Sequence, residues 1–340
     1  MESASERQAQ VSDQREQRRE LDGIFVIDKA MGMTSHDVVA RARRLARQRR
    51  VGHAGTLDPA ATGVLPVCLG QATRVAEYLS ESGKAYRATI RFGAVTDTYD
   101  AEGAIIREAP VTLREEEIAA ALPEFLGEQM QLPPAYSAIK REGQPLYKLA
   151  RAGQEVTLEP RPIVISALRI VSWSSPDLVL DIECGKGTYI RSLAYDLGER
   201  LGPGAHLAAL RRTRSGPFTL KQALTLETLE AALAGEGWRD HLYAPDEALL
   251  DHRAAILASE YEASMRNGQP LRFASPLPPN HVAVAPAQRE TAEASGAIPA
   301  EDGELLRAYS TDGRFLGIAR WNAADAAWQP HKVLHVTPVD

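Results

Sequence analysis

An unbroken alternation of apolar and polar side chains runs through residues 85–92, AYRATIRF. Successive side chains of a β-strand point to opposite faces, so this alternation predicts a strand with one apolar face. The apolar face carries Tyr86, Ala88, Ile90 and Phe92, and the other face carries Arg87, Thr89 and Arg91. The segment Leu178–Cys184 alternates in the same way. The chain is therefore expected to contain a β-sheet.

Helical periodicity occurs beside these strands, which makes α+β the expected fold class. Thr34 and Ser35 are N-cap candidates for a helix whose apolar residues recur at helical spacing, with arginines on its other faces. Other segments with a clear pattern are the helix candidates Thr73–Leu79, 111–127 and Ile190–Leu201, and the strand candidates Ile24–Ile27 and Val64–Leu69.

A length of 340 residues is long for one compact domain, so we expect two. Residues 1–20 are polar and charged, which predicts a disordered tail. A first domain is expected over 21–245 and a small β-rich domain over 246–340. In the second domain, strands are expected at 305–320 and 332–338 around the turn Asp312-Gly313, after a linker or long loop at 273–303.

The net charge of −6 on its own argues against nucleic-acid binding, but the charge is segregated along the chain. Residues 41–50 read RARRLARQRR, and residues 201–226 contain basic residues and no acid. The acids gather in 112–128 and 286–304. The ordinary reading of the arginine run is a solvated helix face, and the alternative is a surface for an anionic polymer.

Several classes of protein are disfavoured by the residue pattern. Cys68 and Cys184 are far apart and have no metal-ligand spacing, which fits a reducing cytoplasm. The 8 histidines form no ligand cluster, so no metal site is expected. No apolar run is long enough to span a membrane, and the N-terminus lacks a signal-peptide core. The segment GKG at 185–187 lacks the glycine pattern of a phosphate loop.

Asp58 is the main candidate for a catalytic residue. It precedes Pro59 in the glycine-bearing segment 52–70, so its backbone is biased toward an extended conformation. Its ordinary role would be to start an Asp-Pro turn. A catalytic carboxylate would need a cation and a substrate-holding group, for which Arg191 and Tyr86 are candidates. Taken singly, these two are typical of a surface arginine and a core tyrosine.

Several long blocks follow one another in a characteristic order. They are GIFVIDKAMGMTSHDVV at 23–39, GHAGTLDPAATGVLPVCLGQATR at 52–74, KAYRATIRFGAVTDTYDAEG at 84–103, PPAYSAIKREGQPLYKLARAG at 133–153, CGKGTYIRSLAYDLG from 184 and GAHLAALRRTRSG up to 216. In this order they resemble the bacterial tRNA pseudouridine-55 synthases, the TruB family. Ala30 stands where the family usually has proline, a change of little expected consequence.

The resemblance implies a pseudouridine-synthase fold with a mixed sheet, followed by a PUA-like domain. It also implies that a uridine of the tRNA T-loop is flipped out and isomerised without a cofactor. Asp58 would act as the nucleophile or as the carboxylate that supports cleavage of the glycosidic bond. Arg191 would keep that carboxylate charged, and Tyr86 would stack on the base and transfer a proton.

Further positions are implied to contact the RNA. Lys29 and Leu210 would line the pocket, Tyr189 would contact the substrate, and His53 would help to hold the arm open. Arg41–Arg50, notably Arg47, Arg49 and Arg50, and Arg211–Arg214, notably Arg211, would bind phosphates. The segment 133–160 resembles a mobile insertion that closes over the T-arm. We expect a cytoplasmic monomer that needs no protein partner.

Two other classes of function stay open. One is an RNA-binding protein or tRNA-folding helper without catalysis, against which the set Asp58, Tyr86 and Arg191 argues; family members can combine both roles. The other is a synthase of the dyskerin type that works on guide-RNA complexes. Activity on a bare T-arm stem-loop would separate these classes.

Overall fold

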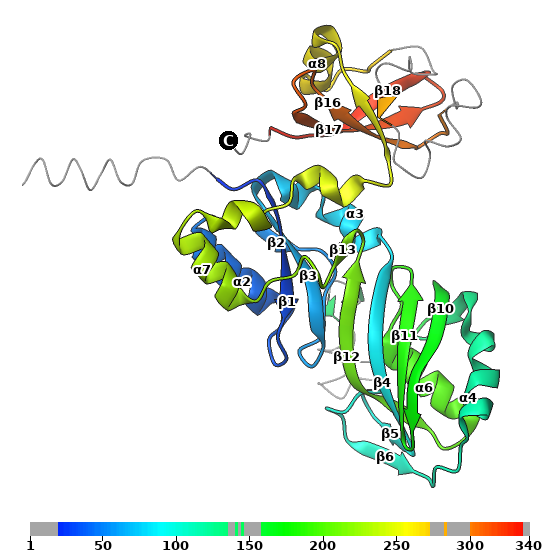
Figure 1. Ribbon diagram of the computed structural model, residues 1–340. Coiled ribbons are helices and arrows are strands. Elements are labelled where there is room, and N and C mark those ends of the chain that lie inside the picture. Colours follow the sequence, from blue (N-terminus) through cyan, green and yellow to red (C-terminus); the bar gives the residue numbers. More distant parts are fainter. Residues whose placement is uncertain are drawn as a thin grey trace, which may run out of the picture.

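The computed structural model describes residues 20–134, 158–272 and 300–335, together with the backbone of three short strands, Lys140–Arg141, Gln144–Pro145 and Val282–Ala283. The predicted tail therefore lies outside the described residues except for Glu20, as do most of the insertion at 133–160 and of the segment 273–303. Helices and two large sheets make up the described chain, so the α+β fold class is confirmed (Figure 1).

The larger sheet has nine described strands and forms the body of the molecule. Its path runs β1-β3-β12-β4-β11-β10-β7, while β2 and β13 pair with β3 and β12 beside it. It is a mixed sheet, because β12 and β3 run parallel and the other described pairs run antiparallel. The strands are β1 Gly23–Lys29, β2 Val51–His53, β3 Thr62–Leu69, β4 Lys84–Phe92, β7 Gly127–Gln131, β10 Arg161–Ser174, β11 Asp177–Cys184, β12 Ala205–Ser215 and β13 Phe218–Thr219.

Strand β4 confirms the alternation in the sequence, because its even-numbered residues are buried. It lies between β11 and β12, where Tyr86 is opposite Ile182 on one side and Arg212 on the other. The parallel pairing of β12 with β3 consists of two residue pairs, Arg211 with Thr62 and Arg212 with Gly63. These two pairs join β1, β2 and β3 to the rest of the sheet.

The helices that matter for the site are α2 (Ser35–Ala46) and α6 (Ile190–Leu201). Thr34 is the N-cap of α2, as predicted, and it exchanges hydrogen bonds with Asp37 in a capping box. In Figure 1, α2 packs beside α7 (Leu226–Ala234) near β1, and α6 packs with α4 (Glu115–Ala121) near the other end of the sheet. None of the described helices is long and apolar enough to cross a membrane.

Two predicted helices are shorter than expected. The segment 73–79 divides into a 3-10 turn, η1 (Gly70–Arg74), and helix α3 (Ala76–Glu81). The segment 111–127 contains α4, which gives way to the 3-10 turn η2 (Leu122–Phe125). Pro123 stands at the start of η2, where its missing N–H and its ring prevent the α-helix from continuing. Two further 3-10 turns are η3 (Gly237–His241) and η4 (Pro245–Leu249). Strands β5 (Ala94–Thr96) and β6 (Ile105–Glu108) pair with each other as a separate hairpin.

The second sheet confirms a β-rich C-terminal part, with helix α8 (Ser259–Arg266) on it. Its strand order is β15-β14-β16-β17-β18, where β14 is Arg253–Ile256, β15 Val282–Ala283, β16 Leu305–Tyr309, β17 Phe315–Asn322 and β18 Ala327–Val333. The turn at Asp312-Gly313 joins β16 to β17 as predicted. The strand predicted at 332–338 is wrong in position: β18 lies earlier, because Ala327 and Trp328 are the residues that enter the core.

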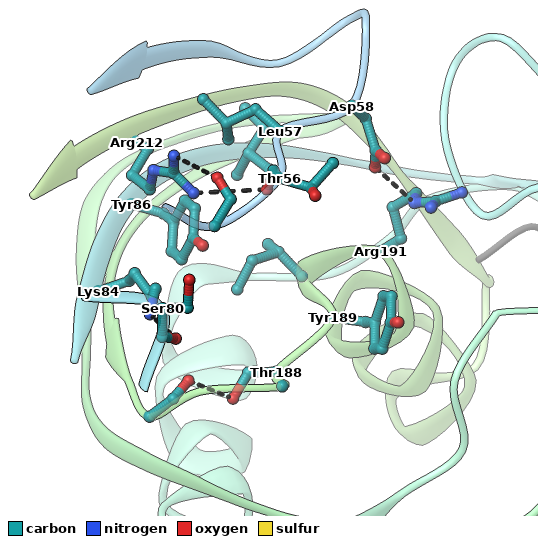
Figure 2. Close-up of a pocket in the computed structure, with 15 residues that line it drawn as sticks. Thr56, Leu57, Asp58, Ser80, Lys84, Tyr86, Thr188, Tyr189, Arg191 and Arg212 are labelled. Atoms are coloured by element: carbon teal, nitrogen blue, oxygen red, sulfur yellow. Dashed lines mark hydrogen bonds and ion pairs between the residues drawn. The ribbon is translucent and has the colours of Figure 1, made fainter. Parts of the chain in front are cut away.

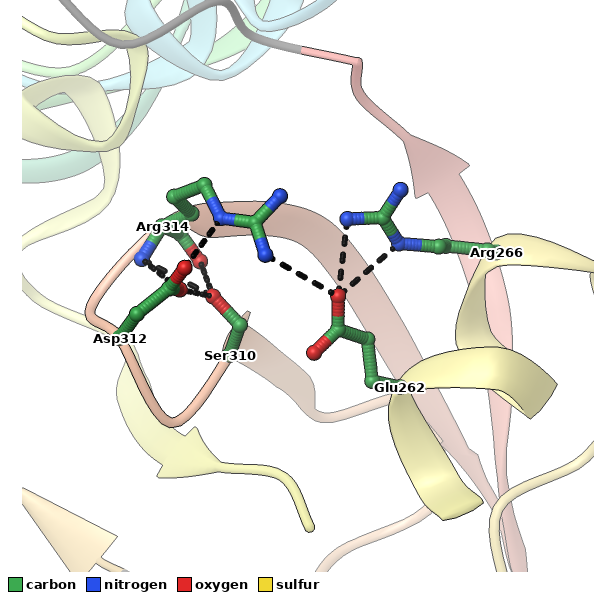
Figure 3. Close-up of polar contacts among 5 residues, drawn as sticks. All are labelled: Glu262, Arg266, Ser310, Asp312 and Arg314. Atoms are coloured by element: carbon green, nitrogen blue, oxygen red, sulfur yellow. Dashed lines mark hydrogen bonds and ion pairs between the residues drawn. The ribbon is translucent and has the colours of Figure 1, made fainter. Parts of the chain in front are cut away.

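A polar cluster fixes the β16–β17 turn and connects it to α8 (Figure 3). Asp312 accepts hydrogen bonds from Ser310 and Arg314. Glu262 on α8 forms ion pairs with Arg266, at 2.8 Å, and with Arg314, at 3.5 Å. The turn and the helix are thereby held as one unit.

The two sheets share an apolar cluster that includes Ile24 and Val26 of β1 and Phe315 and Ile318 of β17. Polar contacts surround it: Arg74 donates to the Val333 carbonyl at 2.7 Å, and the Tyr309 hydroxyl donates to Asp246 at 2.6 Å. The C-terminal sheet is thus packed against the strand that opens the larger sheet.

Candidate active site

Asp58 lies in the loop between β2 and β3, and the residues on both sides of it are anchored to other elements. The buried Ser35 hydroxyl donates to the Leu57 carbonyl at 3.0 Å and accepts from the Leu57 N–H at 2.8 Å. The Pro59 carbonyl accepts from the Lys29 ammonium at 3.1 Å and from the Gly32 N–H at 2.9 Å. The loop is fixed, while 49% of the Asp58 side chain remains exposed.

Arg191, in the first turn of α6, lies between two carboxylates. Its Nε is 3.2 Å from Asp58 Oδ2, and its Nη1 is 3.3 Å from Asp100 Oδ2. Its side chain is 9% exposed, and that of Asp100 is 15% exposed. A guanidinium can donate in two directions at once. The buried Arg191 is held by the enclosed carboxylate of Asp100 and orients the exposed carboxylate of Asp58.

The structure thus adds Asp100, which the residue patterns do not single out. Asp100 is held by an isolated bridge to Leu207, and its Oδ1 accepts from Thr98 Oγ1 at 2.6 Å. Its neighbours in sequence give no signal of a catalytic role, although the block 84–103 that resembles the family contains it.

A cavity of about 280 Å³ opens beside Asp58 (Figure 2). This volume is near the lower end of the ~300–1,000 Å³ that ligand pockets usually have, which suits one nucleoside. In Figure 2, Asp58 and Arg191 point toward each other on one side, while Lys84 and Ser80 lie on the other. The lining residues are Gly55, Thr56, Leu57, Asp58, Ser80, Lys84, Tyr86, Gly185, Gly187, Thr188, Tyr189, Ile190, Arg191, Leu210 and Arg212.

Four of the sequence-predicted residues line this cavity in addition to Asp58. Tyr86 comes from β4, Leu210 from β12, and Tyr189 and Arg191 from the start of α6. The backbone of Tyr189 is clamped by Gln131, whose side chain accepts from the Tyr189 N–H at 2.8 Å and donates to its carbonyl at 3.1 Å. Residues far apart in sequence thus converge on one pocket.

Two cationic residues, Lys84 and Arg212, line the pocket in addition to Arg191. Lys84 donates to the carbonyls of Ser80 and Ser82 at 2.5 and 2.6 Å, and burial lowers its pKa to about 8. Arg212 is 1% exposed. The prediction that Arg211–Arg214 bind phosphates is therefore wrong for Arg212, because its guanidinium is inside the protein.

Lys29 does not line the pocket, contrary to the expectation. It is fully buried, and its ammonium donates to the carbonyls of Ala30, Met33 and Pro59. Burial is the main cause that lowers its pKa. Lys29 thus supports the loop of Asp58 through the Pro59 carbonyl. Its contact with residue 30 uses the backbone carbonyl, so alanine can stand there in place of proline.

His53 lies outside the pocket lining, at the end of β2. Its ring stands edge-on to that of His36, with centroids 5.4 Å apart. Burial, then the proximity of His36 and Arg212, lowers the His53 pKa. Its buried Nδ1 has no hydrogen-bond partner among the described residues.

The arginine run occupies the end of α2 and the turn after it. Arg43, Arg44, Arg47, Arg49 and Arg50 are exposed. Arg47 has a left-handed backbone, with φ of 52°, where the helix ends. Arg211 forms an ion pair with Asp28 at 2.7 Å, so its charge is partly compensated. In the described part of the chain, no group of three or more His, Cys, Asp or Glu could hold a metal ion.

Two family models match consecutive parts of the chain. A model described as the N-terminal domain of the TruB family pseudouridylate synthases matches residues 43–190. A model of the tRNA pseudouridylate synthase B C-terminal domain matches residues 191–253. The chain belongs to the TruB family of tRNA pseudouridine synthases. The resemblance seen in the sequence blocks is thereby confirmed.

Members of the TruB family with a curated name are similar over most of the chain. A tRNA pseudouridine synthase B of Burkholderia mallei (strain NCTC 10247) is 42% identical over 93% of this chain and 98% of its own length. A protein of the same name from Pseudomonas aeruginosa (strain UCBPP-PA14) is 46% identical over 75% of this chain and 85% of its own.

A solved structure supports the TruB-type fold. The Cbf5-Nop10-Gar1 complex contains a chain with a TM-score of 0.68 and 25% identity, over 92% of this chain and 84% of the other. The expected pseudouridine-synthase fold with a mixed sheet is thus confirmed. The PUA-like character of the C-terminal sheet remains a prediction.

Proposed function

We propose that this TruB family enzyme converts the uridine at position 55 of the tRNA T-loop to pseudouridine, in the cytoplasm and without a protein partner. The observation that carries the proposal is Asp58, a half-exposed carboxylate on the wall of a nucleoside-sized pocket, held by Arg191. Its relatives named tRNA pseudouridine synthase B support the choice of tRNA. It is proposed to act as a monomer.

The proposed reaction exchanges two bonds of the base. The bond from N1 to the ribose C1′ breaks, the bond from C5 to C1′ forms, C5 loses a proton and N1 gains one. The target base has to leave the T-loop to enter this pocket. Tyr86, 9% exposed, and Leu210 offer apolar surfaces for the flipped base, while Asp58 faces the ribose or the base and supports cleavage.

The arginines at the end of α2 are proposed to hold the RNA. Arg47, Arg49 and Arg50 are exposed and follow one another closely, and His53 comes three residues later. Contacts of this kind bind phosphates irrespective of sequence, and they position the T-arm rather than act on the base. Arg211 is proposed to join them by exchanging its ion pair with Asp28 for a phosphate.

The proposal is tested by incubating the purified protein with a T-arm stem-loop labelled with tritium at C5 of its uridines. Release of tritium and mapping of pseudouridine to the single target position are the expected results. Asp58→Asn should lower the rate at saturating RNA by ~10³-fold or more and change the dissociation constant less than threefold, since an amide keeps the shape and loses the nucleophile. Residual turnover within tenfold of the unsubstituted enzyme would contradict the role of Asp58.

The same assay separates the other classes of function. A tRNA-folding helper would bind the stem-loop and release no tritium. A synthase that requires a guide RNA would be inactive on the bare stem-loop and active on an assembled guide complex. Refolding of a misfolded tRNA by Asp58→Asn would show that a folding role exists beside catalysis.

A further inference from the structure

Arg212 connects three parts of the protein around the pocket, two of them through hydrogen bonds. Its Nε donates to the Val64 carbonyl at 2.6 Å, and its Nη2 donates to the Gly55 carbonyl at 3.0 Å. Its Nη1 donates to the Thr56 carbonyl at 3.4 Å. Gly55 and Thr56 begin the loop that carries Asp58, so the guanidinium supports that loop from inside the sheet (Figure 2).

The third part is Tyr86, which is directly opposite Arg212 in the pairing of β12 with β4. Directly opposite residues of paired strands have their side chains on the same face, and both Arg212 and Tyr86 line the pocket. A guanidinium has five N–H donors and no acceptor, so in a hydrogen bond between these two side chains the tyrosine oxygen is the acceptor. The hydroxyl hydrogen of Tyr86 then has to point away from Arg212.

The charge of Arg212 is not balanced by an acid. No carboxylate forms an ion pair with it in the part of the chain that the structure describes. Its partners are neutral carbonyl oxygens and one phenol. A buried cation without a counterion favours any neighbouring group that can become negative, and the phenol of Tyr86 is such a group.

We propose that Arg212 is a positioning residue for proton transfer: it turns the Tyr86 O–H toward the base and stabilises the phenolate that forms when Tyr86 gives up its proton. The inference rests on the proposed function, because it assigns a role within the pseudouridine reaction. The proposed role distinguishes Arg212 from Arg211 and Arg214 on the same strand, whose side chains form ion pairs with Asp28 and Glu183.

The proton balance of this step closes within the site. Tyr86 gives its proton to N1 of the base once the bond from N1 to C1′ is broken. After C5 has bonded to C1′, the C5–H bond breaks, its electron pair returns to the ring, and the phenolate takes the proton. Tyr86 ends as the phenol it was, and no other reactant is consumed.

The other titratable groups around Tyr86 leave Arg212 as its positively charged partner. Burial raises the pKa of the Cys184 thiol, on β11, to about 11, so that this neighbour is neutral. Asp58 opposes ionisation of Tyr86, and burial of the phenol itself opposes it most. Lys84, on the same face of β4, has its ammonium bound to carbonyls of the segment 79–82.

The direct test places a ring-fluorinated tyrosine at position 86, where its ¹⁹F resonance reports the protonation of that side chain alone. Its titration midpoint is compared in the unsubstituted protein, in Arg212→Gln and in Arg212→Lys. Removing the charge should move the midpoint upward by about one pH unit or more, a tenfold change in proton affinity. Arg212→Lys retains the charge and should move it less than half as far.

Kinetics provide the second arm, as a double-mutant cycle on the T-arm stem-loop under single-turnover conditions. Arg212→Gln should lower the rate by ~10²-fold with Tyr86 present and less than threefold in Tyr86→Phe, because it acts through the phenol. The dissociation constant of the RNA should stay within threefold. An equal loss in both backgrounds, or an unmoved ¹⁹F midpoint, would overturn the proposal.

The two arms also distinguish possible failures. If the unsubstituted protein makes no pseudouridine, the proposed function fails, while the ¹⁹F titration still measures the coupling between Arg212 and Tyr86. If Arg212→Gln does not fold, as judged by thermal unfolding, Arg212→Lys carries the kinetic cycle. Lysine ends in a compact ammonium and not in a planar fork, so Arg212→Lys should then cost turnover in the Tyr86 background alone. A loss of equal size in Tyr86→Phe would refute the proposal.

Discussion

The contacts of Arg191 show how one side chain organises several others. Its charge is nearly enclosed, and a buried guanidinium is tolerated because it has carboxylates on two sides. Asp58 is open toward the pocket, whereas Asp100 is enclosed. The ion pair with Asp100 therefore sets the position of Arg191. Arg191 in turn sets the position of the Asp58 carboxylate.

Asp100→Asn should lower the single-turnover rate by ~10²-fold, because Arg191 loses one of its two anchors and the geometry at Asp58 loosens. Binding of the stem-loop should change less than threefold, since Asp100 is not part of the pocket lining. The matched control is Asp97→Asn, three residues earlier. A rate for Asp100→Asn within threefold of the unsubstituted enzyme would show that Arg191 does not depend on it.

Asp196 on α6 makes a residue-scale prediction about pH. Burial, then repulsion by Glu199, raises the pKa of Asp196 from 3.8 to about 6. A raised pKa means that the protonated form is favoured by folding, so its contribution is present below pH ~4 and lost as the pH rises through about 6. Asp196→Asn should remove this loss, making the protein more stable than the unsubstituted chain at pH 8 by at most ~3 kcal/mol.

Urea unfolding of both proteins at pH 4 and pH 8 checks this. Their free energies of unfolding should be similar at pH 4 and diverge by pH 8. The exposed Asp240→Asn is the control and should show no such divergence. The prediction would be contradicted if the free energies of unfolding of Asp196→Asn and the unsubstituted protein differed by the same amount at pH 4 and pH 8.

At the scale of elements, most strands and helices near the site follow from local patterns. The alternation over residues 85–92 and the N-cap at Thr34 act within short stretches, so the sequence reveals them. Asp58 stands out through the motif around it. Arg212 does not, because β12 is irregular between Leu207 and Ala209 and between Arg212 and Arg214. These shifts break the rule that alternate residues share a face.

The role of Asp100 could not be predicted for a different reason. Its contact with Arg191 spans 91 positions in the sequence. The contact exists because the segment after β5 is bridged to β12 and α6 packs on the same strand. Partners of this kind depend on strand order, which no local pattern specifies.

Gly63→Ala makes an element-scale prediction about the junction of β3 and β12. A Cβ at Gly63 would lie 2.2 Å from the Arg212 carbonyl oxygen, and the backbone there has φ of 100°. The substitution should lower the free energy of unfolding by ~3 kcal/mol and reduce activity, because the backbone must move. Gly52→Ala, in the neighbouring strand β2, is the matched control, since its Cβ would meet nothing within 4 Å.

Denaturant titrations of the two alanine variants, with circular dichroism as the signal, measure the difference. Gly52→Ala should stay within ~0.5 kcal/mol of the unsubstituted protein. Equal stability of both variants would mean that β3 and β12 are not closely joined at this position.

At the scale of the whole molecule, the question is how a chain of net charge −6 holds an anionic RNA. Replacing Arg47, Arg49 and Arg50 by glutamine should weaken RNA binding and lower the log–log salt slope by about one unit for each phosphate that is no longer bound. The rate at saturating RNA should change little. The control replaces Arg87, Arg91 and Arg169, which have acidic partners on exposed positions of the sheet.

Filter binding of both triple variants over a series of salt concentrations makes the comparison. Both variants have the same net charge, so a general effect of net charge would change the two slopes alike. A salt slope reduced only in the variant of Arg47, Arg49 and Arg50 supports an RNA-binding surface at that end of the molecule. Unchanged affinity of that variant at every salt concentration would place the RNA elsewhere.

The narrow parallel junction of β3 with β12 has a consequence for how the enzyme becomes active while it folds. Asp58 belongs to the part with β1, β2 and β3, whereas Tyr86, Arg191 and Leu210 belong to the part across the junction. Each part can gain its own backbone hydrogen bonds early, but their association joins distant segments and closes long loops. Recovery of turnover after dilution from denaturant therefore marks the docking of the two parts, and a half-assembled chain has secondary structure without any catalytic power.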